Sequence, residues 1–213
     1  MRLRRVIVIV VALAVLALGI FLVFRSGILQ PAADNFTDSF DEPGEWDSGD
    51  DANAFAGVRD GHYEILVRAS SGIFRGSAPH QFADGIYEVT ATQVAGPLDN
   101  GYGLIIRLNP DDNSFYMFEI SGDGYVWAGL CQSQCANQGW EASPAVQQGL
   151  NQPNLLRVVA NGGEMTFIVN DQQVARINDA TLAQGQVGFL VETFGGAGVQ
   201  VNFDDFSVSP IPE

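Results

Sequence analysis

Apolar and polar residues alternate in short runs along most of the chain after residue 35, and Gly, Pro, Asn and Asp separate the runs. A period of two is typical of strands with one buried face, and no sustained 3.6-residue period typical of helices follows residue 35. We therefore predict an all-β domain. Its expected strands occupy residues 36–40, 54–58, 62–69, 72–77, 85–95, 101–109, 113–121, 124–130, 154–161, 164–170, 173–178, 185–193 and 198–208.

The stretch from Asn100 to Leu130 shows this pattern most clearly, as three strands joined by polar turns at 109–113 and 121–124. If residues 102 and 120 face each other across the first hairpin, one face is almost wholly apolar, with Tyr102, Leu104, Ile106, Leu108, Tyr116, Phe118 and Ile120. The other face is mixed, with Gly103, Ile105, Arg107, Phe115, Met117 and Glu119. Such a sheet is typical of one layer of a two-sheet antiparallel sandwich.

An uncharged apolar run extends from Val6 to Phe24, after three arginines and before Arg25. At about 1.5 Å per residue it is long enough for the hydrocarbon core of a bilayer. The arginines that precede it place the N-terminus in the cytoplasm. The alternative is a cleaved signal peptide, but Phe21 to Arg25 are bulky where a cleavage site needs small residues.

This pattern divides the chain into three parts: a cytoplasmic tip with a transmembrane signal-anchor at 1–25, a linker at 26–35 and an extracytoplasmic β-sandwich at 36–209. We expect a single-pass protein of the cell membrane, attached through residues 6–24, with its domain outside the cytoplasm.

The exported part is strongly acidic and contains no lysine. Beyond residue 30 the chain has all 25 of its Asp and Glu residues but only six arginines, an excess of 19 negative charges. This charge repels phosphate backbones, so we expect no nucleic-acid partner. A solvated acidic surface and the binding of divalent cations both remain compatible with it.

Cys131 and Cys135 are the only cysteines. Outside the cell, a pair this close favours a small disulfide-bonded loop. A metal site needs further N or S ligands, and neither His62 nor His80 has suitable spacing. A redox pair usually has the shorter Cys-x-x-Cys spacing.

Several segments resemble the concanavalin A-like lectin/glucanase superfamily, most nearly its laminin-G-like and 3-keto-disaccharide-hydrolase-like branch. They are 38–46 (DSFDEPGEW), 60–65 (DGHYEI), 103–107 (GLIIR), 114–120 (SFYMFEI), 154–159 (NLLRVV), 167–172 (FIVNDQ), 185–189 (GQVGF) and 201–208 (VNFDDFSV). The resemblance covers about residues 36–208 and implies a jelly-roll sandwich whose last strand returns beside the first. Because this fold carries lectins, hydrolases and adhesion modules alike, the resemblance says little about activity.

The glucanase branch carries catalysis on a Glu-x-Asp-x-x-Glu strand, and this sequence has no such spacing. We therefore expect a lectin-like carbohydrate-binding module without evident catalytic machinery. The alternatives are a glycoside hydrolase of the 3-keto-disaccharide type, which needs Glu119 near Glu141 or Asp123, and an adhesive module that binds a surface protein.

The candidate ligand-binding residues are polar or aromatic: Arg107, Glu119, Tyr125, Trp127 and Trp140. Arg107 and Glu119 are predicted to share the mixed face, where they would bind sugar hydroxyls or simply form a cross-strand ion pair. The aromatic rings would stack on sugar rings or pack in a core. We expect Trp46, near the first strand, to lie in the core.

The resemblance also implies that a bound cation can tie the first and last strands together. Asp38, Asp204 and Asp205 are the candidate calcium ligands, since the expected strand arrangement brings them together. The alternative is that these residues are acidic turns that face water.

Overall fold

The computed structural model describes residues 35–136 and 139–212, and residues 32–213 form one compact unit. The predicted signal-anchor at 1–25 and nearly all of the linker lie outside the described residues. In the described part of the chain, no helix is long and apolar enough to cross a membrane. All regular elements in that part are strands, so the all-β prediction is confirmed.

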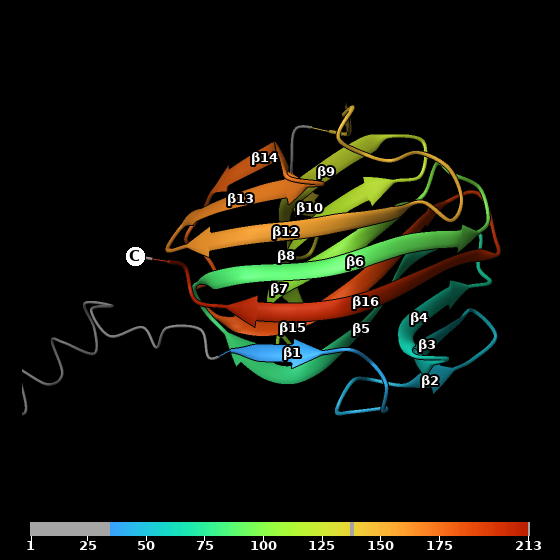
Figure 1. The fold of residues 1–213 in the computed structure, drawn as a ribbon, viewed down its shortest axis with the longest axis horizontal. Helices are drawn as coiled ribbons and strands as arrows, with labels where there is room; N and C mark the ends of the chain where they lie inside the picture. The colour runs from blue at the N-terminus through green and yellow to red at the C-terminus, as the bar shows by residue number, and fades with distance from the viewer. Residues whose placement is uncertain (1–34, 137–138, 213) are drawn as a thin grey trace, which may run out of the picture. The chain divides into compact units, whose positions relative to one another are not determined.

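The strands form two antiparallel sheets, seen as a front and a rear layer in Figure 1. The front sheet has nine strands: β1 (Phe36–Asp38), β2 (Gly49–Asp50), β3 (Ala54–Arg59), β4 (His62–Val67), β6 (Gly85–Ala95), β12 (Pro153–Asn161), β13 (Glu164–Val169), β14 (Gln172–Asn178) and β16 (Val199–Ser209). The rear sheet has seven: β5 (Ser71–Phe82), β7 (Gly101–Asn109), β8 (Ser114–Ser121), β9 (Tyr125–Cys131), β10 (Cys135–Ala136), β11 (Glu141–Ala142) and β15 (Gly185–Phe194).

Neighbouring strands of the front sheet follow the order β14-β13-β12-β6-β16-β4-β3-β2, with β1 also paired to β16. The rear sheet has the order β10-β9-β8-β7-β15-β5, with β11 also paired to β9. The expected return of the last strand beside the first is therefore confirmed.

Every predicted strand is present, within a few residues at each end, except that β5 runs on to Phe82. Pro79 lies inside β5, which is tolerated because β5 is an edge strand and proline has no N–H to donate to a neighbour. The two-residue strands β2, β10 and β11 were not predicted, because an alternating pattern cannot be recognised over two residues.

The main core fills the space between the two sheets. Near its centre Phe189 stacks between Trp46 and Phe203, with ring centroids 4.7 and 4.6 Å away. Trp46 is only 7% exposed, so its predicted place in the core is confirmed. Stacked aromatic rings bury large apolar surfaces and therefore contribute strongly to the stability of the sandwich.

The hairpin of β7 and β8 has the predicted register through three pairs: Tyr102 with Ile120, Leu104 with Phe118, and Ile106 with Tyr116. Beyond Ile106 the register shifts, and Arg107 adopts a φ of 53°. An extra residue in one strand moves the following side chains to the opposite face. Leu108, predicted to face the core, therefore lies on the outer face, and Arg107 leaves that face.

The outer face of the rear sheet carries a second apolar cluster, called here the outer cluster: Ile105, Leu108, Phe115, Met117, Trp127, Cys131 and Leu190. Trp140 packs against it from the loop that follows β10. Apolar side chains thus fill the middle of this face, and the polar residues gather at its two ends.

Candidate functional site

The candidate site lies at one end of the outer face of the rear sheet, where β7, β8, β9 and β15 run side by side. Gly101 pairs with Glu192 on one side, and Gly103 pairs with Glu119 on the other. Glu119 in turn pairs with Trp127. Because side chains alternate along a strand, these residues all belong to the same face.

Glu119 is completely buried on this face, with an exposed fraction of 0%. Neither of its carboxylate oxygens has a hydrogen-bond partner among the described residues. A Cβ atom on Gly101 would overlap Glu119 Oε1 and would lie only 3.1 Å from the Trp140 ring. The absence of a side chain at Gly101 therefore makes room for the Glu119 carboxyl, which lies close to the Trp140 indole.

Burial raises the pKa of Glu119 well above its ordinary value of 4.5, and the negative charge of Glu192 raises this pKa further. Burial also raises the pKa of Glu192, which is only half-buried. The charge of an ionised Glu192 therefore disfavours the ionised form of Glu119. A protonated Glu119 can donate a hydrogen bond as well as accept one.

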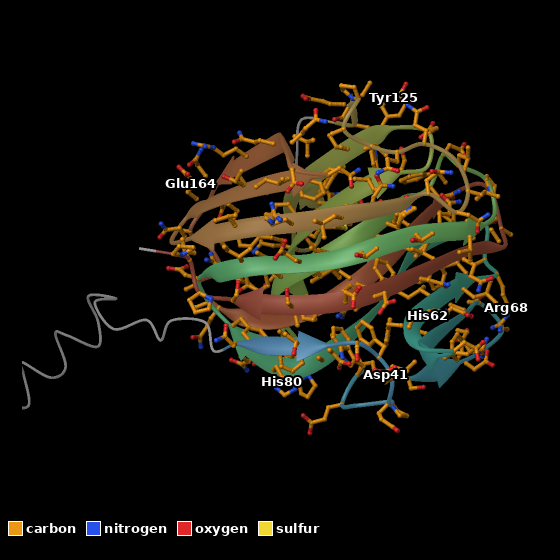
Figure 2. All side chains as sticks on the ribbon, viewed as in Figure 1. Asp41, His62, Arg68, His80, Tyr125 and Glu164 are labelled. Carbon is orange, nitrogen blue, oxygen red and sulfur yellow. A yellow bond between two sulfur atoms is a disulfide. The ribbon has the colours of Figure 1, made fainter. Side chains whose placement is uncertain are left out.

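An open hollow of about 390 Å³ adjoins this carboxyl group and is called here the aromatic hollow. It is lined by three aromatic and three polar residues: Tyr125, Trp140, Phe194, Asp99, Ser121 and Asp123. Tyr125 and Phe194 are 41% and 49% exposed, which is unusual for rings of this size. Figure 2 labels Tyr125 at the end of β9, at the rim of the sandwich.

Local contacts hold the lining of the aromatic hollow in place. The Trp140 and Phe194 rings meet edge to face, with centroids 5.9 Å apart. The Ser121 hydroxyl donates to Asp123 Oδ1 and accepts a hydrogen bond from the Tyr125 backbone N–H at 3.0 Å. The hollow therefore combines fixed apolar rings with carboxylate acceptors, a combination that can stack a sugar ring and bind its hydroxyl groups.

The predicted ligand-binding residues lie in different places. Tyr125 and Trp140 line the aromatic hollow, and Glu119 lies beside it. Trp127 is 7% exposed and belongs to the outer cluster, so its indole packs rather than presenting a free face. Whether these residues bind a ligand stays a prediction.

The expectation that Arg107 shares a face with Glu119 is wrong. Its side chain is buried at one end of the sandwich, where Nη2 donates to Asp84 Oδ1 at 2.8 Å. Its Nη1 donates to the carbonyl oxygens of Gly162 and Leu182, each at 2.9 Å. Arg107 thus ties three loops together, and the physical reason for the error is the bulge that begins after Ile106.

The structure does not bring the expected calcium ligands together. In residues 35–136 and 139–212, no group of three or more His, Cys, Asp or Glu side chains is placed to hold a metal ion. Asp38 accepts hydrogen bonds from the Phe40 N–H and the Trp46 indole, at 2.8 and 2.9 Å. Asp204 accepts one from the Asp205 N–H. The first strand, β1, is held to the last strand, β16, by antiparallel backbone pairing.

The predicted disulfide between Cys131 and Cys135 is confirmed. It closes the turn between β9 and β10, whose residues pair at this position.

Glu141, a candidate partner of Glu119 in the hydrolase alternative, lines a separate groove between β9 and β14. Asp123, the other candidate, lines the aromatic hollow, and Glu192 is the carboxyl group whose charge reaches Glu119.

Four residues at or near the site were not predicted: Asp99, Ser121, Glu192 and Phe194. Leu190, Glu192 and Phe194 are two residues apart along β15, so the strand pattern could have placed Glu192 and Phe194 on the same face as Leu190. Asp99 precedes β7 in an irregular segment, where no periodicity shows which way a side chain points.

No protein-family model matches the sequence, and no curated protein does. Solved structures do match. The domain has a glucanase-like jelly-roll fold. A β-glucanase from Bacillus licheniformis is 10% identical, with a TM-score of 0.64 over 85% of this chain and 100% of that chain. A β-1,3-1,4-glucanase (lichenase) from a mouse hindgut metagenome is 12% identical, with a TM-score of 0.63 over 84% and 100%.

The carbohydrate-binding module CBM66 from Bacillus subtilis is 18% identical to the chain, with a TM-score of 0.55 over 78% of this chain and 97% of that chain. Identities this low show the fold alone. The predicted jelly-roll sandwich is therefore confirmed as the fold of the domain.

Proposed function

We propose that this protein is a membrane-anchored, extracytoplasmic carbohydrate-binding module that binds a neutral glycan at the aromatic hollow. The observation that carries the proposal is the gathering of exposed Tyr125 and Phe194 with Trp140 and two exposed carboxylates around one opening. Aromatic rings stack on the apolar faces of sugars, and carboxylates accept hydrogen bonds from hydroxyl groups.

The charge of the domain narrows the class of glycan. The excess of 19 negative charges beyond residue 30, together with Asp99 and Asp123 at the hollow, disfavours anionic saccharides. Neutral polysaccharides avoid this repulsion. The named glucanases of the same fold make β-glucans the first class to test, since their names describe enzymes that act on such polymers.

The test is binding of the full chain, held in lipid nanodiscs, to a glycan array that includes β-glucans, with empty nanodiscs as the blank. We expect binding that Tyr125→Ala and Phe194→Ala each weaken by about tenfold or more, because each removes a stacked ring. Leu150→Ala is the matched control, since Leu150 is similarly exposed but does not line the hollow. No binding by folded protein would refute the proposal and leave the adhesive alternative.

A second candidate function, glycoside hydrolysis, is favoured by one observation. Glu119 and Glu192 lie on the same face and both have raised pKa values, as general acids do. The test is release of reducing ends from laminarin and mixed-linkage β-glucan. Release that Glu119→Gln and Glu192→Gln both abolish would establish an enzyme, and binding without release would support the binding module.

We also propose that residues 6–24 anchor the protein in the cell membrane. The support is the apolar run with arginines at both ends. Fractionation of cells should recover the chain with membranes after a high-salt wash, and external protease should digest the domain. Recovery of a shortened chain in the soluble exported fraction would instead indicate a cleaved signal peptide.

A further inference from the structure

A second hollow, of about 430 Å³, lies towards the opposite end of the outer face and is called here the arginine hollow. It is lined by polar residues and two apolar ones: Asp47, Arg75, Ser77, Gln186, Leu108 and Pro110. The lining comes from three separate strands, β5, β7 and β15, and from the loops before β2 and after β7. Nothing in the proposed function uses it.

Arg75 stands apart from the other arginines of the domain. Five of the six form ion pairs with carboxylates: Arg59, Arg68, Arg107, Arg157 and Arg176. Arg75 is in no ion pair with any described residue, although the domain carries a large excess of carboxylates. Among the described residues, Arg75 donates one hydrogen bond, from Nη2 to Asn113 Oδ1. The other N–H donors of its guanidinium group remain free.

Asp47 is close enough for its charge to act on Arg75, yet the two form no ion pair. The Asp47 carboxylate is held by Ser77, whose N–H and hydroxyl donate to Oδ2 at 3.0 and 2.7 Å. No described residue donates to Asp47 Oδ1. The hollow therefore contains a fixed acceptor and a half-buried donor that do not satisfy each other. Gln186 adds a second polar side chain that is only partly exposed.

This arrangement selects the chemistry of a ligand. A carboxylate or phosphate would meet Arg75 favourably but would be repelled by Asp47 and by the charge of the domain. Neighbouring hydroxyl groups of a neutral sugar suit both partners, because a hydroxyl accepts from a guanidinium and donates to a carboxylate. Arg75 is partly buried, and its guanidinium donors that lack a protein partner are then satisfied on binding.

We propose that the arginine hollow is a second saccharide-binding site, in which Arg75 donates to and Asp47 accepts from the hydroxyl groups of a neutral sugar ring. The proposal rests on the proposed function, because it assigns the same class of ligand to a second position on the outer face. It implies that a polysaccharide contacts the protein at both ends of that face, through stacking at the aromatic hollow and hydrogen bonds at the arginine hollow.

The test is isothermal titration of the full chain in nanodiscs with laminarin and with mixed-linkage β-glucan. We expect Arg75→Met to weaken binding roughly 10- to 100-fold, because hydrogen bonds to a charged group are lost. Arg75→Lys should recover only part of this loss, since an ammonium lacks the guanidinium fork. The control is Arg68→Met, an exposed ion-paired arginine beside β4 in the other sheet, labelled in Figure 2, which should leave affinity unchanged.

A second measurement locates the contact directly. The Arg75 Nε–H resonance, assigned by its disappearance in Arg75→Met, should shift when laminarin is added to ¹⁵N-labelled protein. If Tyr125→Ala weakens binding, Arg75→Met leaves the affinity unchanged and laminarin does not shift the wild-type Arg75 resonance, the second site is overturned and the first is kept. No binding of either polymer by the wild-type chain would overturn both the second site and the β-glucan form of the proposed function.

Discussion

Replacing Glu119 with Gln should remove a pH-dependent loss of stability from the domain. Burial and the charge of Glu192 raise the pKa of Glu119 in the folded state, whereas the unfolded chain titrates near the ordinary value of 4.5. Between pH 4.5 and the folded-state pKa, the native protein therefore holds one proton more than the unfolded chain. The free energy of unfolding falls as the pH rises through this window, and the full contribution is present below it.

The magnitude follows from this single proton. One proton corresponds to a slope of about 1.4 kcal/mol per pH unit. Gln has nearly the shape of Glu and never ionises, so this slope should be absent in Glu119→Gln. One pH unit above 4.5 the variant should gain about 1.4 kcal/mol over wild type, or about 3–6 °C in Tm for a domain of this size. Below pH 4.5 the two should differ by less than about 1 kcal/mol, since both bury polar atoms without partners.

The assay is urea unfolding of residues 32–213, followed by tryptophan fluorescence at a series of pH values from 4 to 7. Glu42→Gln, which changes an exposed carboxyl group, serves as the control and should follow the wild-type curve. Glu192→Gln should narrow the pH window in which Glu119 lowers the stability, because it removes the charge that adds to the pKa shift at Glu119. Parallel curves for wild type and Glu119→Gln would show that Glu119 ionises as easily in the folded protein as in the unfolded chain, and would refute the reasoning.

Three further changes test the framework around the site. Gly101→Ala should displace the Glu119 carboxyl group and weaken glycan binding, because the added Cβ overlaps Oε1; titration of the variant with laminarin checks this. Arg107→Met should cost about 2–5 kcal/mol in urea unfolding, since it leaves two loop carbonyls without their donor, each worth about 1–3 kcal/mol, and the partly exposed Asp84 without its ion-pair partner. Replacing Cys131 and Cys135 together with Ser should cost about 2 kcal/mol or less in the same assay, because the disulfide closes a very short loop.

The layers of the fold could be predicted because they depend on a local signal, the alternation of apolar and polar residues. The register of the β7–β8 hairpin followed from burying Tyr102, Leu104 and Ile106 on one face. The same reasoning failed at Arg107 and Leu108. The bulge here has a positive φ at Arg107, and an arginine gives no sign of this in the sequence as a glycine would.

The candidate site could be predicted only in part, because much of it lies in turns and loops. Tyr125 was recognised from its place on a strand, whereas Asp99 and Asp47 come from irregular segments whose side chains have no periodic direction. Arg75 could not be predicted for a different reason. Its distinguishing property is that it lacks an ion-pair partner, and only the three-dimensional arrangement shows which arginines are paired.

The burial of Glu119 also bears on the choice between binding and hydrolysis. A general acid must come within hydrogen-bond reach of the glycosidic oxygen, directly or through one water. Glu119 has no exposed surface, and its carboxyl group lies close to the Trp140 indole. Catalysis by Glu119 would therefore require neighbouring side chains to move, and a movement of the Trp140 indole would disturb its edge-to-face contact with Phe194. Binding at the aromatic hollow requires no such movement, because its exposed rings and carboxylates already line the opening, and this difference supports the proposed binding module over hydrolysis by Glu119.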